Sequence, residues 1–156
     1  MDFNKVIAVL GALDEYEVRY ILVGGVAVNL HGLGRTTQDL DLFLETDADN
    51  IRRLRQALAS VFDDPSIDEI SAEDLAGKYP TVRYVPPEEA FVIDLLGRLG
   101  EAFAFDDLEA TDMQVEGVRV RVATPATLYR MKKDTLRPID RMDADALRRK
   151  FELEED

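Results

Sequence analysis

The sequence predicts an α/β fold, in which helices pack on a β-sheet. Runs with apolar residues at helical spacing alternate along the chain with short runs rich in β-branched and aromatic residues. The 156 residues are 46% hydrophobic and 33% charged, a balance that can bury a core and is too apolar for a disordered chain. We therefore expect one folded domain over residues 1–156.

The first third of the chain predicts a helix, a strand, a short helix and a second strand. Residues 3–15 carry apolar side chains at helical spacing, and residues 18–23 form a β-rich run that ends at a pair of glycines. A short helix can follow over residues 26–31. Residues 39–44 begin with alternating acidic and apolar side chains, which is typical of a strand with two unlike faces.

The middle of the chain adds a long helix and two strands. Residues 48–62 have apolar side chains at helical spacing, and an acidic stretch followed by proline stops that helix. Residues 71–77 predict a short helical turn, and strands are expected over residues 81–85 and 91–96. The second strand carries one carboxylate, Asp94, in an apolar setting, which requires a structural or chemical explanation.

The last third predicts a hairpin and two helices. Residues 113–123 alternate in polarity around Gly117, which predicts two strands joined at the glycine. Pro125 is suited to the first turn of a helix that runs to about Lys133, and a last helix is expected over residues 140–153.

The composition excludes several classes of function. The chain has no cysteine, so it has no disulfide, no thiolate zinc site and no cysteine nucleophile; its single histidine, His31, is expected to pack at a helix end. The 32 acidic and 19 basic residues give a net charge of −13, which repels polyanions and disfavours direct nucleic-acid binding without a partner.

No apolar run approaches the roughly 18 residues that a membrane span needs. The N-terminus also lacks the charged and then apolar pattern of a signal peptide. We expect a cytoplasmic protein without membrane association.

Two aspartates on one predicted strand form the centre of the candidate site. Asp39 and Asp41 are two residues apart, so both carboxylates point to the same face of the strand. Their mutual repulsion is relieved by a cation, most naturally magnesium bound through oxygen ligands. If the strand of Asp94 lies beside theirs, the three carboxylates could hold two metal ions about 4 Å apart, the geometry of in-line phosphoryl transfer.

The glycine pair adds a candidate phosphate site. Gly24 and Gly25 end a strand, and a helix that begins at Val26 would direct its free amides at a phosphate. A Gly-Gly pair alone is an ordinary turn, and an Asp-x-Asp pair is common on surfaces. Their order, with 13 residues between Gly25 and Asp39, is more telling than either pair alone.

These segments resemble a known superfamily. Residues 21–44, ILVGGVAVNLHGLGRTTQDLDLFL, resemble the signature of the DNA polymerase β-type nucleotidyltransferases, and residues 92–95, VIDL, resemble its third motif. Residues 35–41, RTTQDLD, are similar to the Arg-x-Thr-x-Asp-x-Asp of small bacterial nucleotidyltransferases related to abortive-infection and toxin–antitoxin (type IV toxin-like) proteins. Residues 128–143 resemble that group's lysine-bearing helix and Lys-Asp-x-x-Asp motif, with Ile139 in place of the motif's lysine.

The resemblance implies a fold and an activity. The fold would be the nucleotidyltransferase fold, an α/β (α+β) domain with a mixed, mostly antiparallel sheet and helices packed on it. The activity would be magnesium-dependent transfer of a nucleoside monophosphate from an NTP to a hydroxyl of a protein, an RNA or a small molecule.

The resemblance also implies roles for individual residues. Asp39 and Asp41 would hold two Mg²⁺ ions, and Asp94 would bind the catalytic ion and help to deprotonate the acceptor hydroxyl. The NTP would be bound by Gly24, Gly25, Arg35, Thr37 and Lys132.

Each of these assignments has a structural alternative. Asp94 could cap a turn or pair with Arg83 or Arg98, and Arg35 could pair with nearby carboxylates. Lys132 and Lys133 lie near a helix C-terminus, where basic residues are favoured whatever their function. Since adjacent helical positions diverge by about 100°, one of these two lysines is expected to point inwards. The roles of Asp140 and Asp143 stay open.

The acidity of the chain also bears on its partners. A basic, antitoxin-like protein or self-association could supply an acceptor surface that the chain itself lacks. The alternative function is a non-catalytic NTP-binding or partner-binding protein with the same fold, although the presence of all three aspartates favours an enzyme. A nucleic-acid mimic would rest on charge alone.

Overall fold

The computed structural model describes residues 2–34, 36–76, 81–98, 103–133 and 138–154. In chain order, its elements are α1 (Phe3–Glu15), β1 (Tyr20–Val23), α2 (Gly24–Leu30), β2 (Asp39–Leu44), α3 (Ala48–Val61), the 3₁₀ helix η1 (Pro65–Glu69), α4 (Ala72–Leu75), β3 (Thr81–Tyr84), β4 (Val92–Leu96), the 3₁₀ helix η2 (Phe105–Asp107), β5 (Ala110–Val115), β6 (Val118–Ala123), α5 (Pro125–Lys132) and α6 (Pro138–Phe151).

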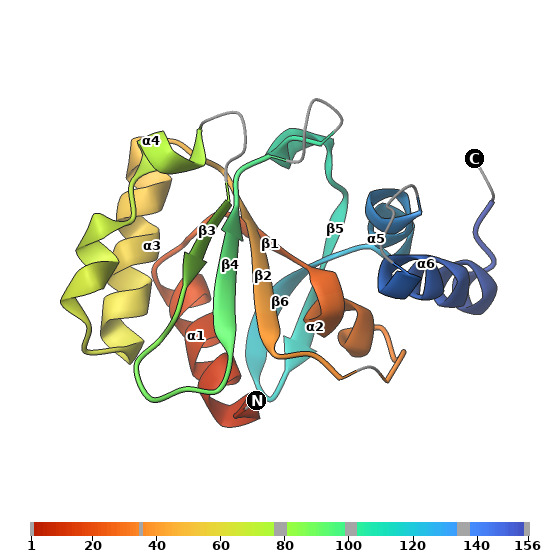
Figure 1. Ribbon diagram of the computed structural model, residues 1–156, viewed down its shortest axis with the longest axis horizontal. Coiled ribbons are helices and arrows are strands. Elements are labelled where there is room, and N and C mark those ends of the chain that lie inside the picture. Colours follow the sequence, from red (N-terminus) through yellow and green to blue (C-terminus); the bar gives the residue numbers. More distant parts are fainter. Residues whose placement is uncertain (1, 35, 77–80, 99–102, 134–137, 155–156) are drawn as a thin grey trace.

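The six strands form one mixed sheet in the order β3-β4-β2-β1-β6-β5 (Figure 1). Within the described residues, three of the five neighbouring pairs are antiparallel, and the β2–β4 and β1–β6 pairs are parallel. The predicted α/β fold with a mixed, mostly antiparallel sheet is therefore confirmed. The two parallel pairs join strands that are distant in the sequence, and one of these pairs carries the candidate site.

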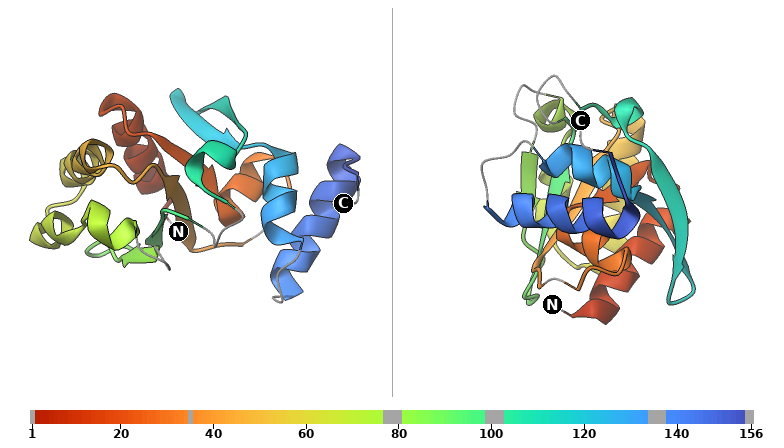
Figure 2. Two further views of the ribbon diagram at one scale, coloured as in Figure 1. Left: turned by 90° about the horizontal axis from the view of Figure 1, so that it is seen from above. Right: turned by 90° about the vertical axis from the view of Figure 1, so that its right-hand side faces the viewer.

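Helices pack at both ends of the sheet and against its strands. In Figures 1 and 2, α3 and α4 lie at one end of the molecule, and α5 and α6 lie at the other, with the strands between them. Helix α1 packs on α3 and β6, whereas α2 contacts β1, β2 and α5. No helix of the described segments has the length and apolarity needed to cross a membrane.

Side-chain caps begin several helices where the sequence places suitable residues. Asp47 accepts a hydrogen bond from the Asn50 amide at the start of α3, and Thr124 accepts one from the Thr127 amide at the start of α5. The sequence does not predict the 3₁₀ helix η1, because residues 63–65, Asp-Asp-Pro, indicate only the end of the preceding helix. Asp64 caps it by accepting from the Ser66 amide.

Several predicted boundaries differ from the structure by a few residues, and two of these differences have a clear physical reason. Helix α2 begins at Gly24, immediately after the strand, and not at residue 26, because the glycine pair is the first turn of the helix and not a loop. Strand β5 begins at Ala110 and not at residue 113, because its pairing with β6 extends to Ala110 opposite Ala123.

His31 joins the central part of the molecule to its C-terminal helices. It is the C-cap residue of α2, and its Nε2 lies 2.8 Å from the carbonyl oxygen of Ala123 at the end of β6. Its ring contacts that of Phe151 edge-on, with centroids 5.8 Å apart. The expectation that this histidine packs at a helix end is confirmed.

Candidate active site

Three aspartates meet where β2 and β4 run side by side. Asp41 lies opposite Asp94 in the parallel register, and Asp39 lies opposite Val92. Neighbouring strands are about 4.8 Å apart, so the carboxylates of Asp41 and Asp94 project side by side from one face of the sheet. On the other face, Leu40 and Leu42 are fully buried. The structure thus places β4 beside β2, the arrangement on which the three-carboxylate hypothesis depends.

Asp41 has the most perturbed carboxyl group of the three. Its pKa is raised to about 7, chiefly by burial and also by the negative charges of Asp94 and Asp39 and by a side-chain hydrogen bond with Asp94. The positive charge of Lys132 acts in the opposite direction. In the absence of a metal ion, Asp41 therefore holds a proton over most of the acidic range.

Arg83 pairs with Asp94 across the neighbouring strands. It lies on the edge strand β3, opposite Asp94 in the antiparallel register. Its Nε donates to Asp94 Oδ1 at 2.9 Å, and its Nη2 donates to Oδ2 at 3.3 Å. Of the two arginines that the sequence offered as structural partners for Asp94, the structure selects Arg83. No motif in the sequence assigns Arg83 a role in the site beyond that pairing.

Gly24 is the glycine that the site requires. It has a φ of 73°, and a Cβ added there would overlap the carboxylate of Asp41. An L-residue would be strained by the backbone conformation and would also collide with the carboxylate. Gly25, the second residue of α2, is buried. The close approach of β1's end to Asp41 therefore depends on Gly24.

Thr37 stabilises the start of β2. Its hydroxyl accepts a hydrogen bond from the Asp39 amide at 3.3 Å and lies 3.4 Å from the Asp39 carbonyl oxygen. This contact sets the backbone at the point where the acidic strand begins. Arg35, the other predicted loop contact, lies outside the described residues.

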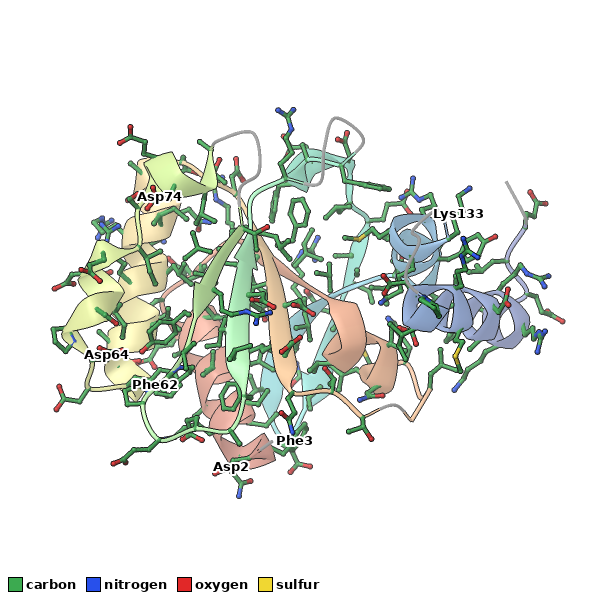
Figure 3. All side chains as sticks on the ribbon, in the orientation of Figure 1. Asp2, Phe3, Phe62, Asp64, Asp74 and Lys133 are labelled. Atoms are coloured by element: carbon green, nitrogen blue, oxygen red, sulfur yellow. The ribbon has the colours of Figure 1, made fainter. Side chains whose placement is uncertain are left out.

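Lys132 is the lysine of α5 that points inwards. It is 8% exposed, and its Nζ lies 3.2 Å from Asp140 Oδ1 and 3.0 Å from Asp143 Oδ2. Lys133, at the end of α5 (Figure 3), has its Nζ 5.8 Å from the centre of the Tyr129 ring. The two lysines thus differ as their helical positions predict, and the two buried aspartates join α6 to Lys132.

The carboxylates are not arranged around a metal ion. In the parts of the chain that the structure describes, no group of three or more His, Cys, Asp or Glu side chains could hold one as it stands. Asp94 is occupied by Arg83, and Asp41 is hydrogen-bonded to Asp94. The donor set itself, three carboxylates on adjacent strands, is of the hard oxygen type that Mg²⁺ prefers. It fits magnesium if Arg83 releases Asp94.

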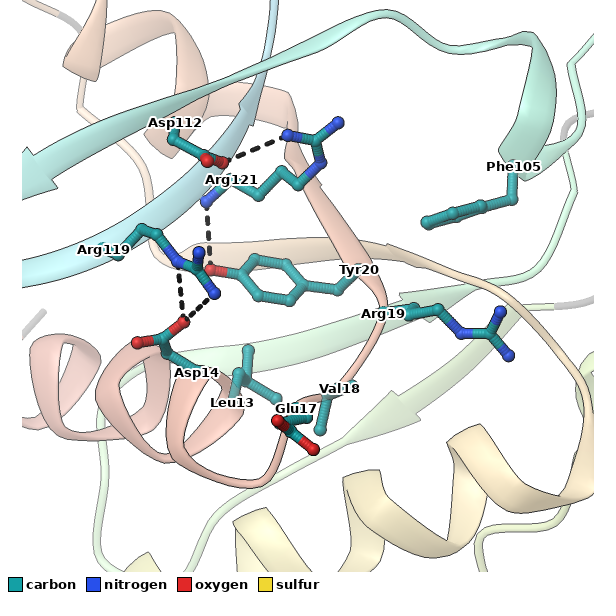
Figure 4. A pocket seen from close by; sticks show the side chains of 10 residues that line it. All are labelled: Leu13, Asp14, Glu17, Val18, Arg19, Tyr20, Phe105, Asp112, Arg119 and Arg121. Carbon is teal, nitrogen blue, oxygen red and sulfur yellow. Dashed lines mark hydrogen bonds and ion pairs between the residues drawn. The ribbon is translucent and has the colours of Figure 1, made fainter.

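A separate cavity of about 420 Å³ lies near the start of β1 (Figure 4). The Tyr20 hydroxyl accepts a hydrogen bond from the Arg121 amide, and two arginine–aspartate pairs, Arg119–Asp14 and Arg121–Asp112, line its wall. The described lining includes none of the three site aspartates. The candidate chemistry and this cavity are therefore at different places on the sheet.

The comparisons with known proteins identify a family and a shared fold. The family described as "Nucleotidyl transferase AbiEii toxin, Type IV TA system" matches residues 8–150. No curated protein shows a significant match.

Several solved structures share the fold. The lincosamide antibiotic adenylyltransferase LnuA, solved with lincomycin bound, is 15% identical, with a TM-score of 0.60 over 93% of this chain and 95% of that chain. A candidate nucleotidyltransferase from Thermotoga maritima is 11% identical, with a TM-score of 0.59 over 96% and 91% of the two chains. A nucleotidyltransferase-like protein from Paracoccidioides brasiliensis is 19% identical, with a TM-score of 0.54 over 92% and 74%.

Proposed function

Because the chain belongs to the AbiEii family of nucleotidyltransferase toxins from type IV toxin–antitoxin systems, we propose that it transfers a nucleoside monophosphate from an NTP to a hydroxyl acceptor, with magnesium. The observation that carries the proposal is the register of β2 and β4. It sets Asp41 directly beside Asp94, with Asp39 on the same face two residues away. Acidic side chains gathered in this way can bind metal ions that neutralise a triphosphate.

The three aspartates have different roles in the proposed site. Asp39 and Asp41 would hold divalent ions, and Asp94 would contribute a third carboxylate to the same site. The ions would supply charge neutralisation for the triphosphate and the leaving pyrophosphate. Asp94 would also accept the proton of the acceptor hydroxyl, whose oxygen would then attack the α-phosphorus as the bond between the α-phosphorus and the pyrophosphate oxygen breaks.

The nucleotide is proposed to lie between α2 and α5. Gly24 and Gly25 would permit a phosphate to approach the backbone closely next to Asp41. The positive charge of Lys132 lowers the pKa of Asp41, so it acts on the same place. Arg35 and Thr37 precede the aspartates of β2 in the sequence, and their proposed contacts with the NTP come from the motif that they match.

The net charge of the chain and its family membership guide the proposals for the acceptor substrate and the protein partner. The net charge of −13 disfavours a free nucleic-acid acceptor, so a protein, a small molecule or an RNA presented by a basic partner is preferred. Membership of a toxin family supports an antitoxin partner. A cytoplasmic location stays a prediction.

Transfer of label from the α-phosphate of each NTP, with and without Mg²⁺, tests the proposal directly. The wild-type protein should label itself or an acceptor in a cell extract, and Asp41→Asn should lose this activity while keeping its circular dichroism spectrum. Asp112→Asn, which changes an aspartate on the far edge of the sheet, is the matched control and should retain activity. Full labelling by Asp41→Asn would overturn the proposal.

A further inference from the structure

A guanidinium stands beside the acidic site. Both Nε and Nη2 of Arg83 donate to Asp94, one to each carboxylate oxygen. Bidentate arginine–carboxylate pairs of this kind are stronger than single contacts. Asp94 is 9% exposed, so the guanidinium is the principal cation that this buried carboxylate meets in the described structure.

The other two aspartates also interact electrostatically with Arg83. Its hydrogen bond and charge interaction with Asp94 raise its pKa, and the charges of Asp39 and Asp41 add to this effect. One guanidinium therefore lies in the field of the same three carboxylates that are proposed to bind metal. Its position opposite Asp94 is set by the antiparallel β3–β4 register and not by a flexible loop.

The side chain of Arg83 has space to move away from the Asp94 carboxylate. It is 61% exposed and lies on the edge strand of the sheet. Arg83 is also one of the residues that line a hollow of about 330 Å³ next to η1, together with Ser66, Glu69, Ile70, Val82, Tyr84 and Val85. A side chain that turned away from Asp94 would therefore remain solvated and would not have to unpack the core.

We propose that Arg83 is the internal counter-cation of this site: it holds Asp94 while no divalent ion is bound, and it competes with that ion for the Asp94 carboxylate. The inference rests on the proposed function, because it takes Asp94 to be a metal ligand. Metal binding then requires Arg83 to give up at least one oxygen of Asp94. Arg83 thereby keeps the metal-free site folded and sets its metal affinity.

Binding of Mn²⁺ alone, counted from the loss of the free-ion electron paramagnetic resonance signal, tests this competition without turnover. Arg83→Gln should bind Mn²⁺ roughly 3- to 10-fold more tightly than the wild type, since one competing positive charge is removed. Arg83→Lys, which keeps the charge and loses the bidentate contact, should lie between them. Arg121→Gln removes an arginine that faces an aspartate on the other edge of the same sheet, and should bind as the wild type does.

Thermal unfolding supplies a second measurement. Without metal, Arg83→Gln should melt below both the wild type and Arg121→Gln, because Asp94 loses its counter-charge. Saturating Mn²⁺ should raise the melting temperature of Arg83→Gln by more than that of the wild type.

Equal or weaker Mn²⁺ binding by Arg83→Gln would overturn the counter-cation role and would leave the proposed transferase standing. Absence of Mn²⁺ binding by the wild type and by every Arg83 variant would overturn the counter-cation role and the metal site together. Label transfer by the wild type would still distinguish a failed inference from a failed function.

Discussion

The two outer strand pairs of the sheet carry the same kind of contact in opposite surroundings. Arg83 faces Asp94 across β3 and β4, and Arg121 faces Asp112 across β6 and β5. The side chain of Asp94 in the first pair is 12% exposed, whereas that of Asp112 in the second is 47% exposed and contacts Arg121 through one oxygen, at 3.1 Å (Figure 4). The charges of Asp39 and Asp41 also act on Arg83 in the first pair. Both are arginine–aspartate pairs across neighbouring strands, and the burial of the aspartate distinguishes them.

The glycines repeat this contrast. Gly24 and Gly117 have nearly the same backbone conformation, with φ values of 73° and 78°. An added Cβ would overlap Asp41 at Gly24, but would meet nothing within 4 Å at Gly117, in the turn between β5 and β6. The backbone strain of an alanine is therefore matched at the two sites, and the difference between them measures the crowding at the acidic site.

The largest expected difference is in activity. Asp94→Asn should lower the rate of label transfer by at least roughly 100-fold, because a charged group that stabilises the reacting centre is lost. Asp112→Asn should leave the rate within about twofold of wild type. Rates measured at saturating NTP and Mg²⁺ compare the two variants, and similar rates for both would remove the functional distinction between the two edges.

The glycine variants should differ mainly in stability. Gly117→Ala should destabilise the protein by about 1 kcal/mol, the cost of a positive φ for an L-residue. Gly24→Ala should cost about 2–3 kcal/mol or more, since the carboxylate of Asp41 must also move. Urea unfolding of the metal-free proteins measures both, and equal losses would mean that the end of β1 can yield without disturbing Asp41.

The stability of the metal-free protein should depend on pH through Asp41. Its carboxyl titrates near pH 7 in the folded protein and near pH 3.8 when unfolded, so the folded state holds more protons between these values. The free energy of unfolding should therefore fall as pH rises from about 4 to 7. Because Asp41 is partly exposed, we expect a contribution of about 1–2 kcal/mol, below that of the full shift.

Asp41→Asn provides the control for this pH dependence. The variant should show a flatter stability curve over the same range and greater stability than the wild type above pH 7. Asp112→Asn should keep the wild-type slope. Chemical unfolding at several pH values in the presence of a chelator provides the measurement, and an unchanged slope in Asp41→Asn would assign the titration to another group.

The smallest expected effect is that of Arg121→Gln. Both partners of its ion pair are about half exposed, so its free energy of unfolding should change by less than about 0.5 kcal/mol. Urea unfolding in low and high salt checks this value. A loss above about 1 kcal/mol would show that the far edge of the sheet depends on its ion pair more than its exposure indicates.

Local sequence patterns predicted most elements of the fold. The alternation of Asp39, Leu40, Asp41 and Leu42 was sufficient to place both carboxylates on one face, because the side-chain period of a strand is fixed. The expectation that 1–156 forms a single domain stays a prediction.

The arrangement across strands could not be predicted in the same way. Asp94 is 53 residues from Asp41 along the chain, and nothing in the local pattern specifies that their strands are parallel neighbours in this register. The bidentate contact of Arg83 depends on that register and on a third strand. The resemblance to a family pointed to Asp94, but it contained no information about Arg83.

The position of His31 makes the attachment of the C-terminal helices observable by NMR spectroscopy. It is the single imidazole of the protein, and it lies where α2, the end of β6 and Phe151 of α6 meet. The histidine side chain therefore gives one pair of ring-proton resonances, in a region of the NMR spectrum free of other imidazoles. Their chemical shifts, displaced by the ring current of Phe151, report whether α6 stays in place while a nucleotide is titrated in.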